Sequence, residues 1–201
     1  MKQQVVAIHG GTSFDTHEDY IAFIKTRELT LEKLKQGEDW KASLSRELGD
    51  AFEVLLPKMP NGTNARYVEW SIWLERCVPF MRDDVILIGH SLGGIFLAKY
   101  LSEHAFPKRI KATLLVAAPF SDTSTVESLT DFALPSSLKM FEGQGGSIYL
   151  LHSTDDPVVP FEQAEQYQQA LPKAQPVIFN DRAHFNQEQF PELVELIQSI
   201  L

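Results

Sequence analysis

Cysteine is nearly absent from this sequence: Cys77 is the only one among 201 residues. A single thiol excludes an intramolecular disulfide and a cluster of cysteine ligands around a metal ion, because each needs at least two thiols. Cys77 falls in a helix-like run beside Leu74 and Val78. We therefore expect a buried structural thiol at this position rather than a nucleophile.

Positive charge is also scarce, with 18 Lys and Arg against 27 Asp and Glu and a net charge of −9. Nucleic acids and anionic membrane surfaces are bound through clustered Lys and Arg, so we expect neither as a partner. No apolar run approaches the roughly 20 residues of a membrane span. The first apolar run, residues 5–8, is too short for the core of a signal peptide. These absences predict a cytoplasmic protein.

Motifs for cofactors are missing as well. The chain has no Gly-x-Gly-x-x-Gly fingerprint, no phosphate-binding loop and no histidine cluster with metal-ligand spacing. We therefore expect no cofactor and no metal. The length suits one domain, and the shares of hydrophobic (44%) and charged (22%) residues are those of an ordinary globular protein.

Short apolar runs alternate with helix-like segments along the chain. The runs lack the polar alternation of half-buried strands, which is typical of strands covered on both faces. We expect strands at 4–8, 52–56, 85–88, 113–117, 147–151 and 177–180, and helices at 19–48, 65–81, 92–104, 161–171 and 191–201. This order predicts an α/β fold with a doubly wound, mostly parallel six-stranded sheet, in a single domain spanning residues 1–201.

The segment 19–48 adds more helix than such a minimal fold needs, and we interpret it as a helical insertion in two pieces that break near Gly37. Asp39 is placed to cap the second piece, in which apolar residues recur every four positions on one face. The apolar residues of this insertion are expected mainly to pack against the sheet. They include Tyr20, Phe23, Ile24, Leu34, Trp40, Leu44 and Leu48.

A second unusual segment, 120–146, is rich in Ser, Thr and Gly and carries apolar residues without helical spacing. Open α/β sheets bind ligands at the carboxyl ends of their strands, and this segment follows such an end. We hypothesise a small apolar lid, with glycines as hinges. In this hypothesis Phe132 and Leu134 help to form an acyl pocket that favours modest hydrophobic esters.

The sequence Gly89-His90-Ser91-Leu92-Gly93 lies between an expected buried strand and a helix-like run. Gly-x-Ser-x-Gly in this context is typical of a nucleophile elbow, a tight turn that exposes a serine above the sheet. Side chains two residues to either side of the serine would collide in such a turn, and the two glycines avoid the collision. Ser91 is therefore the candidate nucleophile.

A serine nucleophile needs a base and a group that orients the base. His184 follows the last expected strand and so lies at the same sheet edge as Ser91, whereas the other five histidines are better explained as packed or surface residues. The acid follows the fifth expected strand, where Asp155 and Asp156 are adjacent and only one can face the imidazole. Asp122, after the fourth strand, is a further alternative.

These motifs together resemble the α/β-hydrolase superfamily along nearly the whole chain. The matching segments are His9-Gly10-Gly11, the Gly-His-Ser-Leu-Gly turn, Asp156-Pro-Val-Val-Pro and His184-Phe185. The resemblance selects Asp156 as the acid, with Asp122 and Asp155 as the weaker choices. The last quarter is similar to the small single-domain serine hydrolases related to retinoblastoma-binding protein nine and YdeN, which have no large cap domain.

The same resemblance implies an oxyanion hole made of two backbone N–H groups. One comes from Leu92 and the other from Gly11, with Thr12 as the alternative. The expected function is that of a carboxylesterase-like serine hydrolase. It would cleave an ester, or a thioester or amide, of a small-molecule acyl substrate through an acyl-enzyme on Ser91. An acyltransferase or lactonase would use the same residues, and a non-catalytic binding protein on the same fold is the alternative from another class.

Overall fold

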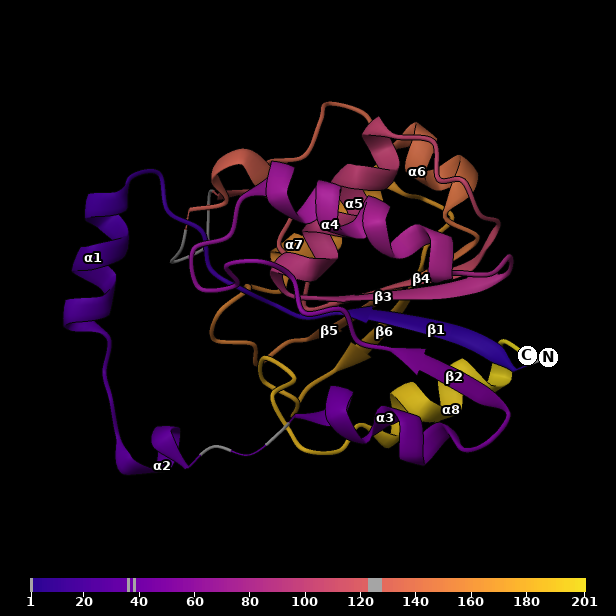
Figure 1. The fold of residues 1–201 in the computed structure, drawn as a ribbon, viewed down its shortest axis with the longest axis horizontal. Helices are drawn as coiled ribbons and strands as arrows, with labels where there is room; N and C mark the ends of the chain where they lie inside the picture. Colours follow the sequence, from indigo (N-terminus) through magenta and orange to yellow (C-terminus); the bar gives the residue numbers. More distant parts are fainter. Residues whose placement is uncertain (1, 36, 38, 123–127) are drawn as a thin grey trace.

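The computed structural model describes residues 2–35, 37, 39–122 and 128–201. Within these residues six strands form one parallel sheet, as the sequence predicted. Their order in the sheet is β2-β1-β3-β4-β5-β6 (Figure 1). The strands are β1 (Gln3–Ile8), β2 (Phe52–Leu55), β3 (Val85–His90), β4 (Ile110–Val116), β5 (Ser147–Ser153) and β6 (Gln175–Phe179). Strand order reverses at β1, so β3 is central and carries its C-terminal turn to the middle of the sheet edge.

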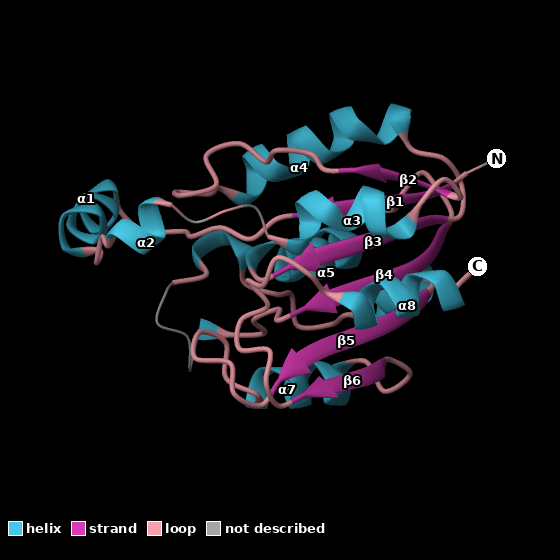
Figure 2. Ribbon diagram, turned by 90° about the horizontal axis from the view of Figure 1, so that it is seen from below, coloured by secondary structure: helices cyan, strands magenta, loops and turns pink. Residues whose placement is uncertain are grey.

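Helices cover both faces of the sheet. They are α1 (His17–Thr26), α2 (Leu31–Leu34), α3 (Trp40–Leu48), α4 (Tyr67–Cys77), α5 (Leu92–Glu103), α6 (Lys139–Gln144), α7 (Glu162–Ala170) and α8 (Pro191–Ser199). Helices α4, α5, α6 and α7 lie on one face, and α3 and α8 lie on the other (Figures 1 and 2). The layered arrangement buries every residue of β3, which explains its unbroken apolar run.

Each face of the sheet has its own core, and successive residues of β3 alternate between the two. Val85 and Leu87 pack with the α4–α7 side, where Trp70 and Phe96 are fully buried. Ile86 belongs to the core on the α3 and α8 side. The two cores fix the sheet from both sides and so fix the positions of the strand ends.

The N-terminal insertion divides into a packed part and a protruding part. In α3 the predicted cap is present, because the Asp39 carboxylate accepts a hydrogen bond from the N–H of Lys41. The predicted apolar face of α3 is confirmed, since Trp40, Leu44 and Leu48 are all buried.

Helix α1, in contrast, has no buried residue and stands away from the sheet (Figure 1). The prediction that Tyr20, Phe23, Ile24 and Leu34 pack against the sheet is therefore wrong. The rings of Tyr20 and Phe23 pack on Phe14 instead, with centroids 5.6 and 5.0 Å from its ring. The reason lies in the layers, because α3 and α8 already cover that face of the sheet.

The second unusual segment contributes core rather than a pocket wall. Phe132 and Phe141 are fully buried, and the Phe132 ring packs edge-on against Trp70 at 5.3 Å between centroids. Leu134 is partly buried against the same core. The predicted acyl pocket made by Phe132 and Leu134 is thus not found among the described residues, and residues 123–127 lie outside them. Whether this segment moves as a lid stays a prediction.

Candidate active site

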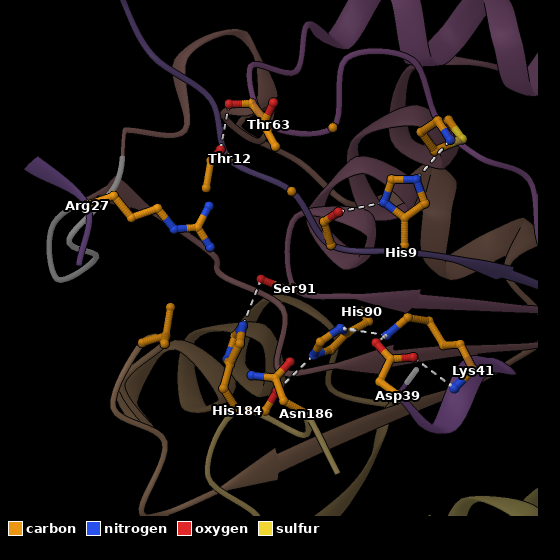
Figure 3. A pocket seen from close by; sticks show the side chains of 15 residues that line it. His9, Thr12, Arg27, Asp39, Lys41, Thr63, His90, Ser91, His184 and Asn186 are labelled. Carbon is orange, nitrogen blue, oxygen red and sulfur yellow. Dashed lines mark hydrogen bonds and ion pairs between the residues drawn. The ribbon is translucent and has the colours of Figure 1, made fainter. Parts of the chain in front are cut away.

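Three loops meet at the carboxyl edge of the sheet and bring the sequence-predicted catalytic residues together. Figure 3 shows two of these residues, Ser91 and His184, facing each other. Ser91 follows β3, Asp156 follows β5 and His184 follows β6. The Ser91 Oγ atom lies 3.0 Å from His184 Nε2, and His184 Nδ1 lies 2.9 Å from Asp156 Oδ2. The three side chains therefore form one continuous hydrogen-bonded chain.

The turn that carries Ser91 has the strained geometry expected of the motif. Ser91 has φ 53° and ψ −122°, a backbone conformation that residues other than glycine rarely adopt. A Cβ on Gly89 would lie 2.4 Å from the carbonyl oxygen of Gly93, and a Cβ on Gly93 would lie 2.6 Å from the carbonyl oxygens of Ile8 and His9. Both glycines are thus required by close backbone packing, and Ser91 sits at the start of α5.

Asp156 is built to orient His184. Its side chain is 0% exposed, and its Oδ1 accepts hydrogen bonds from the N–H groups of Val158 and Val159 at 2.8 and 3.0 Å. These two donors fix the orientation of the buried carboxylate. The carboxylate then accepts a hydrogen bond from the Nδ1–H group of His184, which leaves Nε2 as an acceptor for the hydroxyl of Ser91.

The two alternative acids have other partners. The Asp155 carboxylate accepts hydrogen bonds from the Ser153 hydroxyl and from the N–H of Ala183, and the Ser153 bond is the main reason that the pKa of Asp155 is lowered. The Asp122 carboxylate accepts a hydrogen bond from the N–H of Leu129. Of the three candidate aspartates, only Asp156 is hydrogen-bonded to His184.

The backbone donors around Ser91 distinguish between the oxyanion candidates. The N–H of Thr12 donates to the carbonyl of Gly62 at 2.9 Å and so is already engaged. Within the described chain no hydrogen bond uses the N–H of Gly11 or of Leu92. A Cβ on Gly11 would lie 2.5 Å from the Gly62 oxygen, so this loop packs tightly beside the nucleophile. Gly11 and Leu92 thus keep free donors here, and Thr12 does not.

The loop that carries His184 is held by three hydrogen bonds to its carbonyl groups. His90 Nε2 lies 2.9 Å from the carbonyl oxygen of His184. The indole N–H of Trp40 donates to the carbonyl of Phe185, and the backbone N–H of Trp40 donates to the carbonyl of Gln187, each at 2.9 Å. Ala183 and Phe185, on either side of His184, both have positive φ, so these bonds hold a strained loop.

An ion pair between the buried Lys41 and the partly buried Asp39 supports His90. Lys41 Nζ lies 2.5 Å from Asp39 Oδ2 and 3.2 Å from His90 Nδ1. Burial lowers the pKa of Lys41 and, together with the nearby charge of Lys41, holds the pKa of His90 well below its usual range. A neutral His90 that accepts from Lys41 at Nδ1 carries its proton on Nε2, where it donates to the carbonyl of His184.

A cavity of about 600 Å³ opens beside Ser91. Most of its lining residues are of polar types, although carbon atoms form more of the exposed wall than nitrogen and oxygen do. The polar lining residues include His9, Thr12, Arg27, Asp39, Lys41, Thr63, His90, His184 and Asn186 (Figure 3). Sequence reasoning missed Arg27 and Lys41 as site residues. Lys41 could have been noticed, because it lies three positions before Leu44 on the buried side of α3, whereas Arg27 gives no signal in the sequence.

The other expectations concern what the site does not hold. No group of three His, Cys, Asp or Glu residues that could hold a metal ion occurs in the described ranges. His152 is buried and bonded to the carbonyl of Val159, and burial lowers its pKa. Among the helices of the described chain, none has the length and hydropathy needed to cross a membrane. Cys77 is half-buried, and burial raises the pKa of its thiol.

Comparison with known proteins supports the fold and the class of enzyme. The family model described as "Serine hydrolase" matches residues 33–199, which is most of the chain. The chain therefore belongs to this serine hydrolase family and is a serine hydrolase of the α/β-hydrolase fold.

Among its relatives is the serine hydrolase RBBP9 of Rattus norvegicus, which is 31% identical over 158 residues, 75% of this chain and 78% of that protein. The solved structure of the ydeN gene product from B. subtilis is 20% identical, with a TM-score of 0.78, and the match covers 99% of this chain and 98% of that one. A putative lipase from Acinetobacter baumannii AYE matches with a TM-score of 0.65 at 14% identity, covering 99% of this chain and 84% of that one. The two structures support the fold.

Proposed function

We propose that the protein is a carboxylesterase-like hydrolase that cleaves small-molecule acyl substrates through a covalent acyl-enzyme on Ser91. The observation that carries this proposal is the continuous hydrogen-bonded chain from Asp156 through His184 to the Ser91 hydroxyl. In this geometry the base can take the proton at the moment the hydroxyl attacks. The family match supports hydrolysis as the reaction.

In the proposed first step Ser91 Oγ bonds to the carbonyl carbon of the ester, and His184 Nε2 takes the hydroxyl proton. The carbonyl oxygen becomes negative and accepts hydrogen bonds from the N–H groups of Gly11 and Leu92. When the bond to the leaving oxygen breaks, His184 returns the proton to that oxygen and the alcohol departs. Asp156 keeps its charge and stabilises the imidazolium that forms in between.

In the second step water takes the place of the alcohol. His184 removes a proton from the water, whose oxygen attacks the acyl carbon, and the proton then returns to Ser91 Oγ as the acid is released. The products are one carboxylic acid and one alcohol for each ester and water consumed. An acyltransferase would run the same second step with an alcohol or amine in place of water.

The test is covalent labelling with a fluorophosphonate probe, followed by identification of the modified peptide by mass spectrometry. Wild-type protein should be labelled on Ser91, and Ser91→Ala should lose both labelling and the hydrolysis of p-nitrophenyl acetate. Ser102→Ala is the matched control, because Ser102 lies near the far end of the same helix and its hydroxyl bonds to the carbonyl of Ala98. Labelling that persists in Ser91→Ala, or is absent from the wild type, would exclude the proposal.

A further inference from the structure

The cavity beside Ser91 is lined by few large apolar side chains, although carbon atoms form the larger part of its exposed surface. Its larger apolar side chains are only Met59 and Val158, and the rest of its described wall is glycine, hydroxyl, amide, imidazole and charged groups. Pockets for apolar ligands are lined mainly by hydrophobic and aromatic side chains. The lining residues therefore offer a substrate several polar groups beside the carbon surface of the wall, and a charged group among them can select a polar substrate.

Three charged side chains line this cavity: Arg27, Asp39 and Lys41. The charges of Asp39 and Lys41 compensate each other, because Lys41 Nζ lies 2.5 Å from Asp39 Oδ2. Lys41 also directs its ammonium group toward His90 Nδ1 at 3.2 Å. Both charged groups thus interact with other protein groups, which fixes their positions in the cavity wall.

Of the three charged residues in the lining, Arg27 is the one outside the Asp39–Lys41 ion pair. It follows the last residue of α1, and its guanidinium carbon lies 5.5 Å from the centroid of the Phe23 ring. No carboxylate of the described residues forms an ion pair with it. Figure 3 shows its side chain extending from the edge of the cavity toward Ser91 and Thr12. The protein has a net charge of −9, yet Arg27 brings to the cavity of the nucleophile a cation that has no ion-pair partner among the described residues.

A guanidinium group recognises a carboxylate through two parallel hydrogen bonds, and these charge-assisted bonds are stronger than neutral ones. Placed in the wall of a substrate cavity, it selects a ligand that carries an anionic group at a distance from the reacting carbonyl. Nearby hydroxyl and amide groups of Thr12, Thr63 and Asn186 give such a group a polar surrounding.

We propose that the substrate of this hydrolase carries a carboxylate and that Arg27 binds it, so that Arg27 is a specificity-determining residue. This inference rests on the proposed function, since it assumes that Ser91 attacks an acyl carbonyl in the same cavity. Arg27 takes no part in bond making: the ester bond breaks by the two steps given above, and the distant carboxylate keeps its charge throughout. A monoester of a dicarboxylic acid is the simplest compound of this class.

The experiment compares esters that differ only in this group. The p-nitrophenyl monoesters of succinic, glutaric and adipic acid are each paired with the butyrate, pentanoate or hexanoate ester, in which a methyl group replaces the carboxylate. A second pair, 3-acetoxybenzoate and 3-methylphenyl acetate, places the carboxylate on the leaving alcohol instead. Rates are corrected with Ser91→Ala as the blank, because dicarboxylic monoesters also hydrolyse without an enzyme.

For wild-type protein we expect kcat/KM to favour the anionic member of at least one pair by about tenfold. Arg27→Gln should remove this preference, and Arg27→Lys, which keeps the charge but not the paired donors, should keep part of it. The preference should also fall as salt is added. Lys25→Gln is the control, because Lys25 is an exposed cation of α1 outside the cavity wall.

Fluorophosphonate labelling of every variant separates this inference from the proposed function. Equal labelling of Arg27→Gln and wild type shows that the nucleophile is intact, and thermal unfolding shows that the fold is kept. A labelled wild type that prefers the neutral ester in every pair, or an Arg27→Gln variant with an unchanged preference, overturns the role of Arg27. A wild type that is not labelled overturns the proposed function itself.

Discussion

Trp40 donates its indole N–H to the carbonyl oxygen of Phe185 at 2.9 Å, and this bond joins helix α3 to the loop of the candidate base. Phe185 follows His184 directly and has φ 53°. The backbone N–H of Trp40 also binds the carbonyl of Gln187, so one residue holds the loop at two points. The position of His184 therefore depends on a helix that lies between the first two strands in the chain.

Replacing Trp40 by Phe should reduce activity without removing the nucleophile. The substitution keeps an aromatic ring in the buried site but leaves the carbonyl of Phe185 without its donor, which costs about 1–3 kcal/mol of stability. We expect kcat to fall by about tenfold with a smaller change in KM, because His184 is less well placed for proton transfer. Trp73→Phe is the control, since Trp73 is 40% exposed on α4. Equal kcat values in the two variants would contradict the positioning role.

The adjacent aspartates should respond differently to the same change. Asp156→Asn should lower kcat by about three to four orders of magnitude, because an amide neither holds the Nδ1 proton of His184 correctly nor stabilises the imidazolium. Asp155→Asn should lower it far less, since Asp155 binds the backbone N–H of Ala183 rather than the imidazole. Steady-state kinetics on one ester measures both. A larger loss in Asp155→Asn, or in Asp122→Asn, would mean that another carboxylate serves His184.

The Asp39 and Lys41 pair should be coupled in stability. Removing one partner of a largely buried ion pair leaves the other charge uncompensated, so Asp39→Asn and Lys41→Met should each lower the free energy of unfolding by about 1–3 kcal/mol. The double variant should lose less than the sum of the two. Urea denaturation of the four proteins gives the coupling energy. Strictly additive losses would show that the two side chains act independently.

Stability should also fall as the pH is lowered from about 7.5 to 5.5. Burial lowers the folded-state pKa of His90 and of His152, whereas in the unfolded chain both titrate near 6.5. Below that pH the unfolded state binds more protons than the folded state, so the free energy of unfolding declines by up to about 1.4 kcal/mol per pH unit for each histidine. Urea denaturation at several pH values measures this slope. His152→Gln should make it shallower, and a flat or rising profile toward pH 5.5 in the wild type would contradict the prediction.

The features that could be predicted from sequence are those that depend on neighbouring residues, such as apolar runs and the spacing of glycines. The strand before Ser91 is apolar throughout because both of its faces are covered, and the flanking glycines follow from close backbone contacts. His184 was predictable because the carboxyl ends of parallel strands meet at one edge. Choosing Asp156 over Asp155 needed family resemblance, since neighbouring residues of one loop give no local signal of which side chain points inward.

The predictions that were wrong share a physical cause, which is that local sequence does not determine tertiary packing. Apolar residues at helical spacing predict that a helix is amphipathic, but not which surface it meets, so α1 and α3 gave the same expectation and only α3 packs on the sheet. Phe132 lacks helical spacing and still lies in the core, because a one-turn helix carries it against Trp70. Arg27 was missed because its place in the cavity depends on the path of the whole N-terminal segment.

Helix α1 places Arg27 at the cavity although none of its own residues is buried. The residues that keep the protein folded and the residue proposed to choose the substrate thus belong to separate parts of the chain. Substitutions in α1 can alter the charge and reach of the cavity wall while the two cores stay unchanged. Such a division lets substrate preference diverge between related enzymes at little cost in stability, and it makes α1 the natural segment to randomise in directed evolution of this hydrolase.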